Sequence, residues 1–360
     1  NNVPRIEYDA TGAVKGLLIE EARTNLVTSS GDVTGTGWTT DLSAGTLTTG
    51  SPFGTYQTIS PTSTGTGSNG AKVYQIGKTL TSGATYVFSA LVKYSAGSGW
   101  VGVMPYNTSS TGTHSAWFDL QNGVVGSKDT NIIDYGMIDY GDGWWLCWAS
   151  KNAGSTSGGA SLEVVNANGS FDRSAADTLL IAGSQIEAGA FPTSYIPTTG
   201  SAPATRAKDI AEIPTSAFGY NNDKGTVVCE FDSASRNGST IFTLVVGQAT
   251  DGITAIIYPA NRVSYQVVTG GAVQVNLNFD AYATASQVSK VATVYAKDDF
   301  AAVLNGGAVA TDTAGSVPLV STLKLGVYWG GGNFFMSGHI KSIQYYPRRL
   351  TNTQLQELTT

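Results

Sequence analysis

Acidic residues come closest, in this sequence, to the requirements of catalysis. A retaining glycosidase needs two carboxylates about 5–5.5 Å apart, one acting as acid and one as nucleophile. Asp134, Asp139 and Asp142 flank a glycine-rich turn, and Asp298 and Asp299 lie in a turn between two strand-like segments. Aspartate is common in turns because its side chain hydrogen-bonds the nearby backbone. We therefore interpret both sets as turn residues and predict that the protein is not an enzyme.

Metal, thiol and nucleotide chemistry also lack their usual residue spacing. The two histidines, His114 and His339, form no H-x-x-x-H pair, and the two cysteines, Cys147 and Cys229, form no C-x-x-C motif. A zinc site is therefore not predicted. Both cysteines lie within apolar segments, which favours buried free thiols over a disulfide. The glycine-rich stretches separate predicted strands and open no helix, so they indicate turns rather than phosphate-binding loops.

Tryptophans offer a different chemistry, because sugars present apolar C–H faces that pack on flat aromatic rings. Successive residues of a strand point to opposite faces. In residues 143–149, Cys147 and Ala149 suit a core, which turns Trp144 and Trp148 to the other surface of the sheet. These two tryptophans are therefore candidates for ligand contact.

The same alternation extends the candidate site to two further segments. In residues 116–120 the apolar set points inward and leaves Trp117 and Asp119 outside, and in residues 84–93 it leaves Lys93 outside. We predict one glycan-binding platform made of Trp117, Trp144 and Trp148, with Asp119 and Lys93 as polar partners. The alternative is that these tryptophans pack in the core or under loops.

A second concentration of aromatic residues lies near the end of the chain. Tyr328 and Trp329 precede three glycines, an asparagine and two phenylalanines. A loop that exposes so much apolar area usually has a partner. We predict a second glycan contact at Tyr328 and Trp329, with burial against the other module or a neighbouring subunit as the alternative.

Composition limits the remaining function classes. The chain has 360 residues, 44 of them glycine, with only 13% charged residues and a net charge of −6. Nucleic-acid binding requires a basic stripe to neutralise phosphates, and no such cluster is present. No apolar run approaches the roughly 18–20 residues that cross a membrane. We expect neither nucleic-acid binding nor membrane insertion.

The elements that would position these residues are short segments with period-two hydrophobicity, separated by turns. Such a pattern predicts an all-β protein of two antiparallel β-sandwich (jelly-roll) domains in tandem. A short C-terminal helix is predicted after Thr351, with Gln354 in the capping-box position. The predicted organisation is an N-terminal entry or anchoring segment (1–27), a first sandwich (28–197), a linker (198–208) and a second sandwich (209–360).

Long segments of the sequence resemble known protein families. Residues 4–26, with Pro4-Arg5-Ile6-Glu7-Tyr8-Asp9 at their start, and residues 182–209 resemble the entry and exit of a jelly roll similar to carbohydrate-binding modules. That module occurs in phage and prophage structural proteins. Residues 300–307, 325–340 and 345–358 resemble the concanavalin A-like, laminin-G-type sandwich.

The resemblance implies a bacteriophage virion protein, such as a fibre, spike or head-decoration protein, on the virion surface or otherwise extracellular. It would be a non-catalytic adhesion protein that binds a bacterial surface polysaccharide for host attachment and contacts other virion proteins. Phage attachment proteins are commonly trimeric, so a homotrimer is also implied. Two alternatives stay open: a purely structural decoration protein, and a polysaccharide-degrading enzyme, because both sandwich types also host hydrolases and lyases.

A structural Ca²⁺ is the one cofactor that the resemblance suggests. Jelly rolls of this kind often hold Ca²⁺ near the first and last strands through acids and backbone carbonyls. The ligands offered here are Glu187 and Asp177, with Glu20 and Glu21 nearby. Gln185 departs from the pattern, because it stands where an acidic ligand is expected, and this departure argues against the ion.

Overall fold

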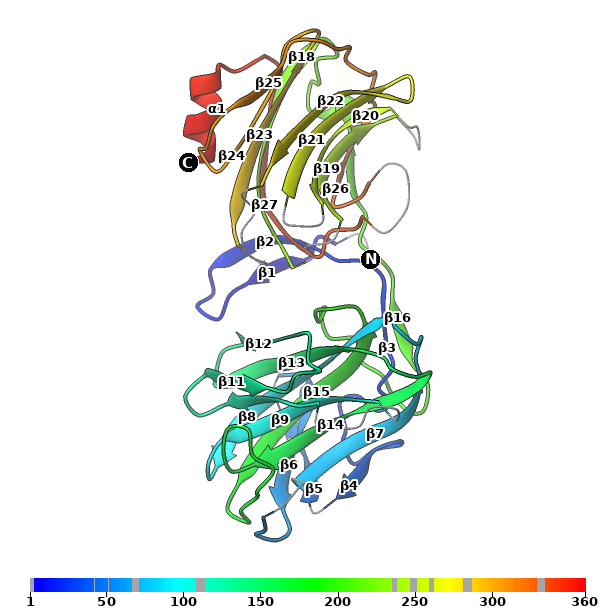
Figure 1. The fold of residues 1–360 in the computed structure, drawn as a ribbon, viewed down its shortest axis with the longest axis vertical. Helices are drawn as coiled ribbons and strands as arrows, with labels where there is room; N and C mark the ends of the chain where they lie inside the picture. Colours follow the sequence, from blue (N-terminus) through cyan, green and yellow to red (C-terminus); the bar gives the residue numbers. More distant parts are fainter. Residues whose placement is uncertain are drawn as a thin grey trace. The chain divides into compact units, whose positions relative to one another are not determined.

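The computed structural model describes residues 3–41, 43–50, 52–66, 71–107, 114–234, 238–246, 251–258, 262–280, 287–328 and 334–360. The chain divides into two compact units (Figure 1). Residues 22–207 form the first sandwich, and residues 1–21 together with 208–360 form the second sandwich. The paired strands are antiparallel and one short α-helix lies near the C-terminus, which confirms the predicted fold class.

The first sandwich consists of two six-stranded sheets and one short ribbon. The front sheet has the order β12-β13-β8-β15-β6-β5, and the back sheet has the order β11-β10-β9-β14-β7-β4. The front strands are β12 (Asp134–Asp139), β13 (Trp144–Asn152), β8 (Thr85–Ala96), β15 (Thr178–Ala188), β6 (Gly54–Pro61) and β5 (Ser43–Gly50). The back strands are β11 (Val124–Lys128), β10 (Ala116–Asp119), β9 (Trp100–Asn107), β14 (Ser157–Val165), β7 (Ala71–Thr79) and β4 (Thr39–Asp41). The ribbon pairs β3 (Arg23–Asn25) with β16 (Ala204–Arg206).

The core of the first sandwich follows from the alternation of its strands. In β8, Phe88, Ala90 and Val92 are fully buried between the sheets, where they pack with Cys147 and Ala149 from β13. Cys147 is a free thiol, as predicted, and its burial raises its pKa well above the ordinary value. The intervening residues of both strands point to the outer surface of the front sheet.

The second sandwich combines a seven-stranded sheet with a six-stranded sheet. The first contains β1 (Ile6–Tyr8), β2 (Val14–Ile19), β27 (Gly338–Tyr346), β18 (Lys224–Ser233), β23 (Ser289–Ala296), β24 (Phe300–Leu304) and β25 (Ala310–Asp312), in that order. The other contains β17 (Ala211–Pro214), β26 (Thr322–Leu325), β19 (Ser239–Val245), β20 (Gly252–Tyr258), β21 (Arg262–Thr269) and β22 (Ala272–Phe279). A 3₁₀ turn, η1, spans Thr215–Ala217, and the α-helix, α1, spans Asn352–Thr359.

Helix α1 begins as the sequence predicts. Thr351 accepts a hydrogen bond from the backbone of Gln354, whose side chain accepts one from the Thr351 backbone, so both halves of the capping box are present. The helix lies beside β23 and β24 (Figure 1). Its apolar side, represented by Leu355, packs on residues of these two strands. Cys229 in the neighbouring β18 is also a buried free thiol, and burial raises its pKa.

The structure divides the chain differently from the predicted organisation at two places. Residues 1–27 were expected to form a separate segment, but the β1–β2 hairpin of residues 1–21 extends a sheet of the second sandwich, with Leu18 opposite His339 of β27, and residues 22–27 belong to the first sandwich. The predicted linker, 198–208, contributes β16 to the first sandwich instead. Pairings between residues so far apart in the chain leave no local signal in the sequence.

A buried histidine ties the N-terminal hairpin to the second sandwich. The Nδ1 atom of His339 lies 2.9 Å from an Asp232 carboxylate oxygen, and Nε2 contacts the Glu7 carboxylate. Lys15 pairs with Glu7 at 3.3 Å. Burial lowers the pKa of His339, but the hydrogen bonds to Asp232 and Glu7 outweigh that effect and raise the pKa to about 9. The histidine is therefore protonated at neutral pH and bridges two carboxylates.

This arrangement predicts a pH-dependent stability of the second sandwich. The folded pKa of His339 lies above its ordinary value of 6.5, so its stabilising contribution is complete below pH 6.5 and is lost as the pH rises through about 9. The loss should be on the order of 1–2 kcal/mol after solvent screening. Thermal unfolding measured from pH 6 to pH 10 should show this decline in the native chain and a flatter profile in His339→Gln. Identical pH profiles for the two proteins would contradict it.

Candidate functional site

The outer surface of the front sheet brings residues from three central strands into register. Antiparallel pairing places each outward residue of β8 between one residue of β13 and one of β15. The three resulting rows are Trp148–Ser89–Gln185, Leu146–Leu91–Gly183 and Trp144–Lys93–Leu180. Gly183, at the β15 end of the middle row, leaves space above the sheet, which the rings of Phe53 and Tyr195 enter.

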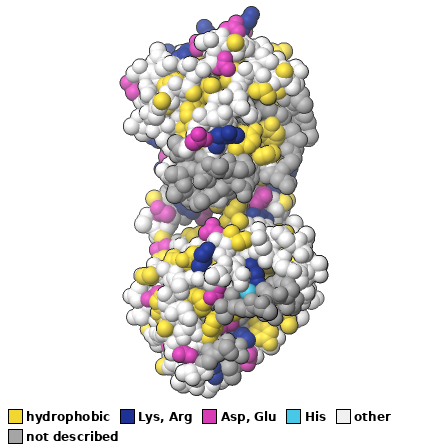
Figure 2. Space-filling view, in the orientation of Figure 1, with side chains coloured by type: hydrophobic (Ala, Val, Ile, Leu, Met, Phe, Trp, Pro, Cys, Tyr) yellow, Lys and Arg dark blue, Asp and Glu magenta, His cyan; other side chains and the backbone are white. Residues whose placement is uncertain are grey.

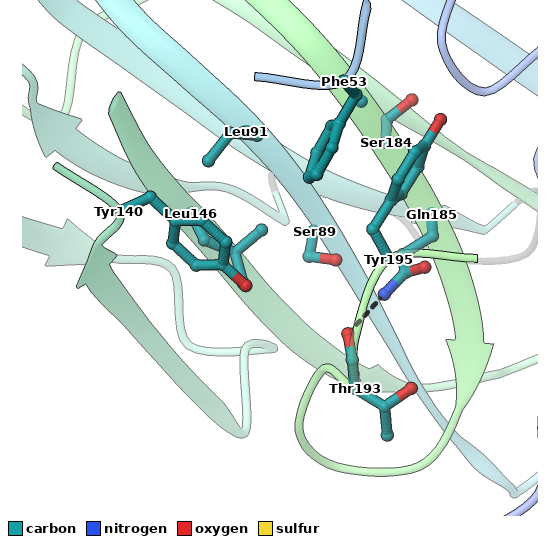
Figure 3. A pocket seen from close by; sticks show the side chains of 10 residues that line it. Phe53, Ser89, Leu91, Tyr140, Leu146, Ser184, Gln185, Thr193 and Tyr195 are labelled. Atoms are coloured by element: carbon teal, nitrogen blue, oxygen red, sulfur yellow. Dashed lines mark hydrogen bonds between the residues drawn. The ribbon is translucent and has the colours of Figure 1, made fainter. Parts of the chain in front are cut away.

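A small pocket lies over the first two of these rows (Figure 3). Its sides are three aromatic rings: Phe53, just before β6; Tyr140, just after β12; and Tyr195, after β15. Phe53 and Tyr195 stack with their ring centroids 4.5 Å apart. In Figure 3, Ser89 lies below Phe53, with Tyr140 on one side and Tyr195 on the other. The exposed fractions of Phe53 and Tyr140 are 39% and 43%, so both rings are accessible from solvent.

A buried hydrogen-bond network holds the loop that carries Tyr195. The side-chain amide of Gln185 donates to the Thr193 carbonyl at 2.7 Å, a contact drawn in Figure 3, and to the Glu187 carboxylate at 2.9 Å. Glu187 also accepts from the Thr193 backbone and hydroxyl. The Gln185 carbonyl accepts from the backbone of Ile196 at 3.0 Å. Two strand residues, Gln185 and Glu187, thus fix the loop on both sides of Tyr195, whose hydroxyl bonds Ser30 at 2.8 Å.

The same network shows that the predicted Ca²⁺ ligands do not form a metal site. The Glu187 carboxylate is fully buried and already accepts hydrogen bonds, and burial raises its pKa despite those bonds. Asp177 accepts from the backbones of Ser98 and Ser174. It precedes the first residue of β15 whereas Glu187 lies near the last, about 30 Å away along an extended strand. One ion cannot bind both carboxylates.

The other two acids named for the metal site lie outside the first sandwich. Glu20 belongs to the second sandwich and pairs with Arg5 at 2.8 Å. Arg5 also pairs with Asp209, which accepts the Glu20 backbone amide. Within the described ranges, no three His, Cys, Asp or Glu residues are grouped as metal ligands would be. The residues therefore do not fit the Ca²⁺ that the resemblance suggested.

Trp144 and Lys93 lie together on the front sheet, as the alternation predicted, but Trp144 is buried. Only 6% of Trp144 is exposed, because it packs on Leu91 and meets Tyr56 edge-on at 6.0 Å. The Lys93 ammonium lies 6.0 Å from the Trp144 ring centroid and donates to the Asp142 carbonyl. Lys93 and Tyr56 thus cover the ring instead of leaving it as an open platform.

Trp148 occupies the opposite end of the same surface. Its half-buried indole lies over Gly136 of β12, where even a Cβ atom would approach the ring to 2.8 Å. Trp148 is also the β13 neighbour of Ser89, which places it beside the pocket. Of the three predicted tryptophans, Trp148 therefore remains the one with both the position and the exposure to reach a ligand there.

Trp117 and Asp119 lie on the other side of the first sandwich, so the predicted single platform is wrong. Both residues belong to β10 of the back sheet, and their inward neighbour Phe118 packs in the core. Trp117 is 3% exposed, donates to the Ser170 carbonyl at 3.0 Å and contacts Phe171 edge-on. The alternation of each strand was predicted correctly, but the sequence does not show that the two strands belong to opposite sheets.

Asp119 has a local role in the chain turn that follows β10. One carboxylate oxygen accepts from the backbones of Gln121 and Asn122, both at 3.0 Å, and the other accepts from the Asn122 side chain at 2.8 Å. Asp119 as a whole is 7% exposed. Asp119 therefore caps a turn and does not face a ligand together with Trp144.

In the second sandwich, Tyr328 packs in an aromatic cluster. Its ring lies 5.5 Å from that of Phe334, which in turn meets Tyr258 at 6.1 Å, and Tyr328 also packs on Val245 and Val268. Burial raises the pKa of Tyr328. Trp329, predicted as its partner in glycan contact, lies outside the described residues.

The acidic residues considered for catalysis lie in turns or at the ends of a strand, because Asp134 and Asp139 are the first and last residues of β12. Asp142 and Asp298 have left-handed backbone conformations, with φ of 52° and 58°, which is typical of turn aspartates. Asp139 accepts from the Gly141 backbone at 2.8 Å. Asp299 pairs with Arg349 at 3.0 Å. The Asp298 carboxylate accepts from the Gly315 backbone at 3.0 Å.

Sequence reasoning missed the residues around the pocket. Phe53 lies in a part of the chain without a recognisable motif, and Tyr195 was noted only as part of the exit segment that resembles a family. Ser89 lies four residues before Lys93, a predicted polar partner of the platform, and Tyr140 lies two residues before Asp142, an acid considered for catalysis. The alternation in β8 places Ser89 on the same surface as Lys93, so that signal was available from the sequence.

The surface contains few charges. In Figure 2, Lys and Arg side chains stand singly or beside acidic ones, and most of the visible surface is neutral. This agrees with the 13% of charged residues in the chain. On the described part of this face there is no basic stripe of the kind that binds nucleic acid. No described helix is long and apolar enough to cross a membrane.

Comparisons with known proteins show distant structural similarity. No family model matches the sequence, and no curated protein matches it. Among solved structures, the CBM40 module of Ruminococcus gnavus IT-sialidase bound to alpha2,3 sialyllactose has 20% identity and a TM-score of 0.36, covering 42% of this chain and 97% of that chain. Domains LG4-5 of the mouse laminin alpha1 chain have 10% identity and a TM-score of 0.31, covering 79% and 90%. Chicken galectin 2 has 11% identity and a TM-score of 0.25, covering 34% and 88%.

These similarities are to β-sandwich proteins, and none of them identifies a ligand or a functional residue for this chain. The candidate site is therefore defined by the residues themselves. We call the aromatic pocket of Phe53, Tyr140, Tyr195 and Ser89, together with the neighbouring Trp148, the front-sheet site.

The burial of Trp144 predicts that it stabilises the first sandwich. Trp144→Ala should lower the free energy of unfolding by about 3–5 kcal/mol, the usual cost of removing a buried tryptophan. Phe53→Ala, at a ring that is 39% exposed, should cost about 1 kcal/mol or less. Denaturant unfolding of the two variants measures the difference. Equal stabilities would contradict the packing described for Trp144.

Proposed function

We propose that this protein is a non-catalytic carbohydrate-binding protein that holds glycan at the front-sheet site. The observation that carries the proposal is the grouping of Phe53, Tyr140 and Tyr195 around one pocket, with two of the rings 39% and 43% exposed. Exposed aromatic rings at a concave site, supported by buried structure, match the apolar C–H faces of sugar rings.

The rigidity of the site supports this proposal. Tyr195 is held by the Gln185–Glu187–Thr193 network, and Phe53 stacks on Tyr195. A ring that is already fixed loses little conformational freedom when a ligand binds, so more of the contact energy appears as affinity. Ser184, Gln185 and Thr193 add polar groups to the pocket lining.

The absence of catalysis is part of the proposal. The acids that come nearest to a glycosidase pair are Asp139, the last residue of β12, and Asp142, in the tight turn between β12 and β13. Hydrolysis by a retaining mechanism needs two carboxylates on either side of a bound glycosidic bond. None of the described residues that line the front-sheet pocket is an acid.

We further propose that the ligand is a bacterial surface polysaccharide and that the chain is a virion protein used for host attachment. Support comes from the resemblance of residues 4–26 and 182–209 to segments of phage structural proteins. Single sugar sites bind weakly, and a homotrimer would raise the effective affinity by presenting three sites to one polysaccharide.

A purely structural decoration protein is the second candidate, and the burial of two tryptophans favours it. Trp117 and Trp144 are 3% and 6% exposed, and both pack within the first sandwich. In that case the exposed rings at the front-sheet site would contact another virion protein.

Substitution of the exposed rings tests the proposed function. The double variant Phe53→Ala with Tyr140→Ala should reduce glycan binding at least about tenfold, because each aromatic–sugar contact contributes on the order of 1 kcal/mol or more. A glycan array, followed by pulldown of bacterial cells with the full chain, measures the effect.

Tyr8→Ala is the matched control, because Tyr8 is 57% exposed but belongs to the second sandwich. It should bind glycan as the native chain does. No array or cell signal from the native chain would contradict the proposed function, and so would an unchanged signal from the double variant.

A further inference from the structure

The chain enters and leaves the first sandwich through one two-stranded ribbon. It passes between the two sandwiches at residues 21–22 and 207–208. Just inside these points, β3 and β16 pair antiparallel, with Arg23 opposite Arg206 and Asn25 opposite Ala204 (Figure 1). Both connections to the second sandwich are therefore continuous with this β3–β16 ribbon.

The ribbon packs against the loop of residues 189–196, which carries Tyr195 and is called here the Tyr195 loop. The fully buried Asn25 donates from its side-chain amide to the Ile196 carbonyl at 2.9 Å. Arg206 donates to the Ser194 carbonyl at 3.4 Å. The backbone on both sides of Tyr195 is therefore bonded to the ribbon as well as to β15.

Arg23 covers the beginning of the same loop. Its guanidinium lies over the Phe191 ring, 5.1 Å from the ring centroid. It also fills the space above Gly189, where a Cβ atom would come within 1.8 Å of a guanidinium nitrogen. The loop thus begins and ends on residues of the ribbon.

Glu187 links the ribbon to the Tyr195 loop through charge. Arg23 and Arg206 lie directly opposite each other, and like charges in that position repel. Burial raises the pKa of the Glu187 carboxylate, whereas hydrogen bonds from Thr193 and the charges of both arginines lower it. One buried carboxylate therefore compensates the two arginines of the ribbon and at the same time holds Thr193 of the loop.

These contacts make separate opening of the ribbon and the loop unfavourable. If the loop moved alone, Asn25 and Glu187 would lose buried hydrogen-bond partners. If the ribbon moved alone, Glu187 would lose its two counter-charges. A buried charge or donor left without its partner costs more than the hydrogen bond contributes when it is made. Segments that share such contacts open locally as one unit.

We propose that the β3–β16 ribbon regulates the front-sheet site: the ribbon and the Tyr195 loop open and close together, so the order of the connection between the sandwiches sets the affinity for glycan. Phe53 stacks on Tyr195, so opening of the loop also displaces an exposed ring of the site. The inference rests on the proposed glycan-binding function and adds its regulation. Arg23, Asn25 and Arg206 are positioning residues, because they act through the loop.

Hydrogen exchange of the full chain without glycan tests the coupling. Arg206→Met should speed amide exchange about 3- to 10-fold, the effect of one lost hydrogen bond, in residues 23–25 and in residues 193–196 alike. Arg206→Lys, which keeps the charge and a donor, should restore most of the native protection. Faster exchange in the ribbon with unchanged exchange at residues 193–196 overturns the coupling.

Arg173→Met is the matched control for this substitution. Arg173 belongs to the same sandwich and donates to the Ser63 hydroxyl at 3.5 Å, but it precedes β15, whereas the Tyr195 loop follows that strand. Both segments should keep their native exchange rates in this variant. If Arg173→Met accelerates them as Arg206→Met does, the effect is a general loss of stability and the coupling is overturned.

Glycan binding tests the regulatory part of the inference. The probe is the oligosaccharide that gives the native chain its strongest signal on the glycan array. Arg206→Met should weaken its binding about 3- to 10-fold, because binding must then also order the loop and the ribbon. Arg206→Lys should recover the native affinity. In the native chain the same oligosaccharide should slow exchange at residues 23–25 as well as at residues 193–196.

The outcomes distinguish this inference from the proposed function. Native affinity in Arg206→Met overturns the regulation and leaves carbohydrate binding intact. No array signal from the native chain overturns both. If Arg206→Met does not fold, exchange in the native chain decides: slowing by the oligosaccharide in both segments supports the inference, and slowing in only one segment or in neither overturns it.

Discussion

The antiparallel register of β13, β8 and β15 is the constraint on which the rest of the first sandwich depends. It assigns alternate residues of three long strands either to the core or to the outer surface of the front sheet. Phe88 and Cys147 thereby pack inside, whereas Ser89 and Trp148 become neighbours outside. A shift by one residue would exchange the two sets and remove both the core and the pocket at once. Stability and the candidate function therefore share one origin.

The loop after β15 converts that flat surface into a site. Gln185 and Glu187 project from the same strand as Gly183 and bond Thr193 and Ile196 across the loop. The energetic cost of burying the Glu187 carboxylate, visible in its raised pKa, is offset by the hydrogen bonds it accepts. An acidic residue that suggested a metal ligand thus acts as the support of an aromatic residue, Tyr195.

Several features could be predicted from the sequence because their signals are local. Period-two hydrophobicity identifies strands such as β24, and Thr351 with Gln354 identifies the start of α1. Face assignment within a strand was also correct, since Cys147 is in the core and Trp144 is not in the same cluster. These inferences use only neighbouring residues.

The features that could not be predicted depend on pairing between distant segments. Trp117 and Trp144 each point outward, but from opposite sheets, and no local pattern distinguishes a front strand from a back strand. The same limitation hid the pairing of Leu18 with His339 and the contribution of Phe53 to the pocket. Burial of Trp144 by Tyr56 and Lys93 likewise involves three separate strands. Sequence alone therefore located part of the site surface but not its shape.

A crystal structure of the full chain with a bound oligosaccharide tests the central claim most directly. The account predicts a sugar ring against Phe53 and Tyr140, above the outer surface of the front sheet and beside Trp148. Electron density for the oligosaccharide on the back sheet near Trp117, or only on the second sandwich near Tyr328, would contradict it.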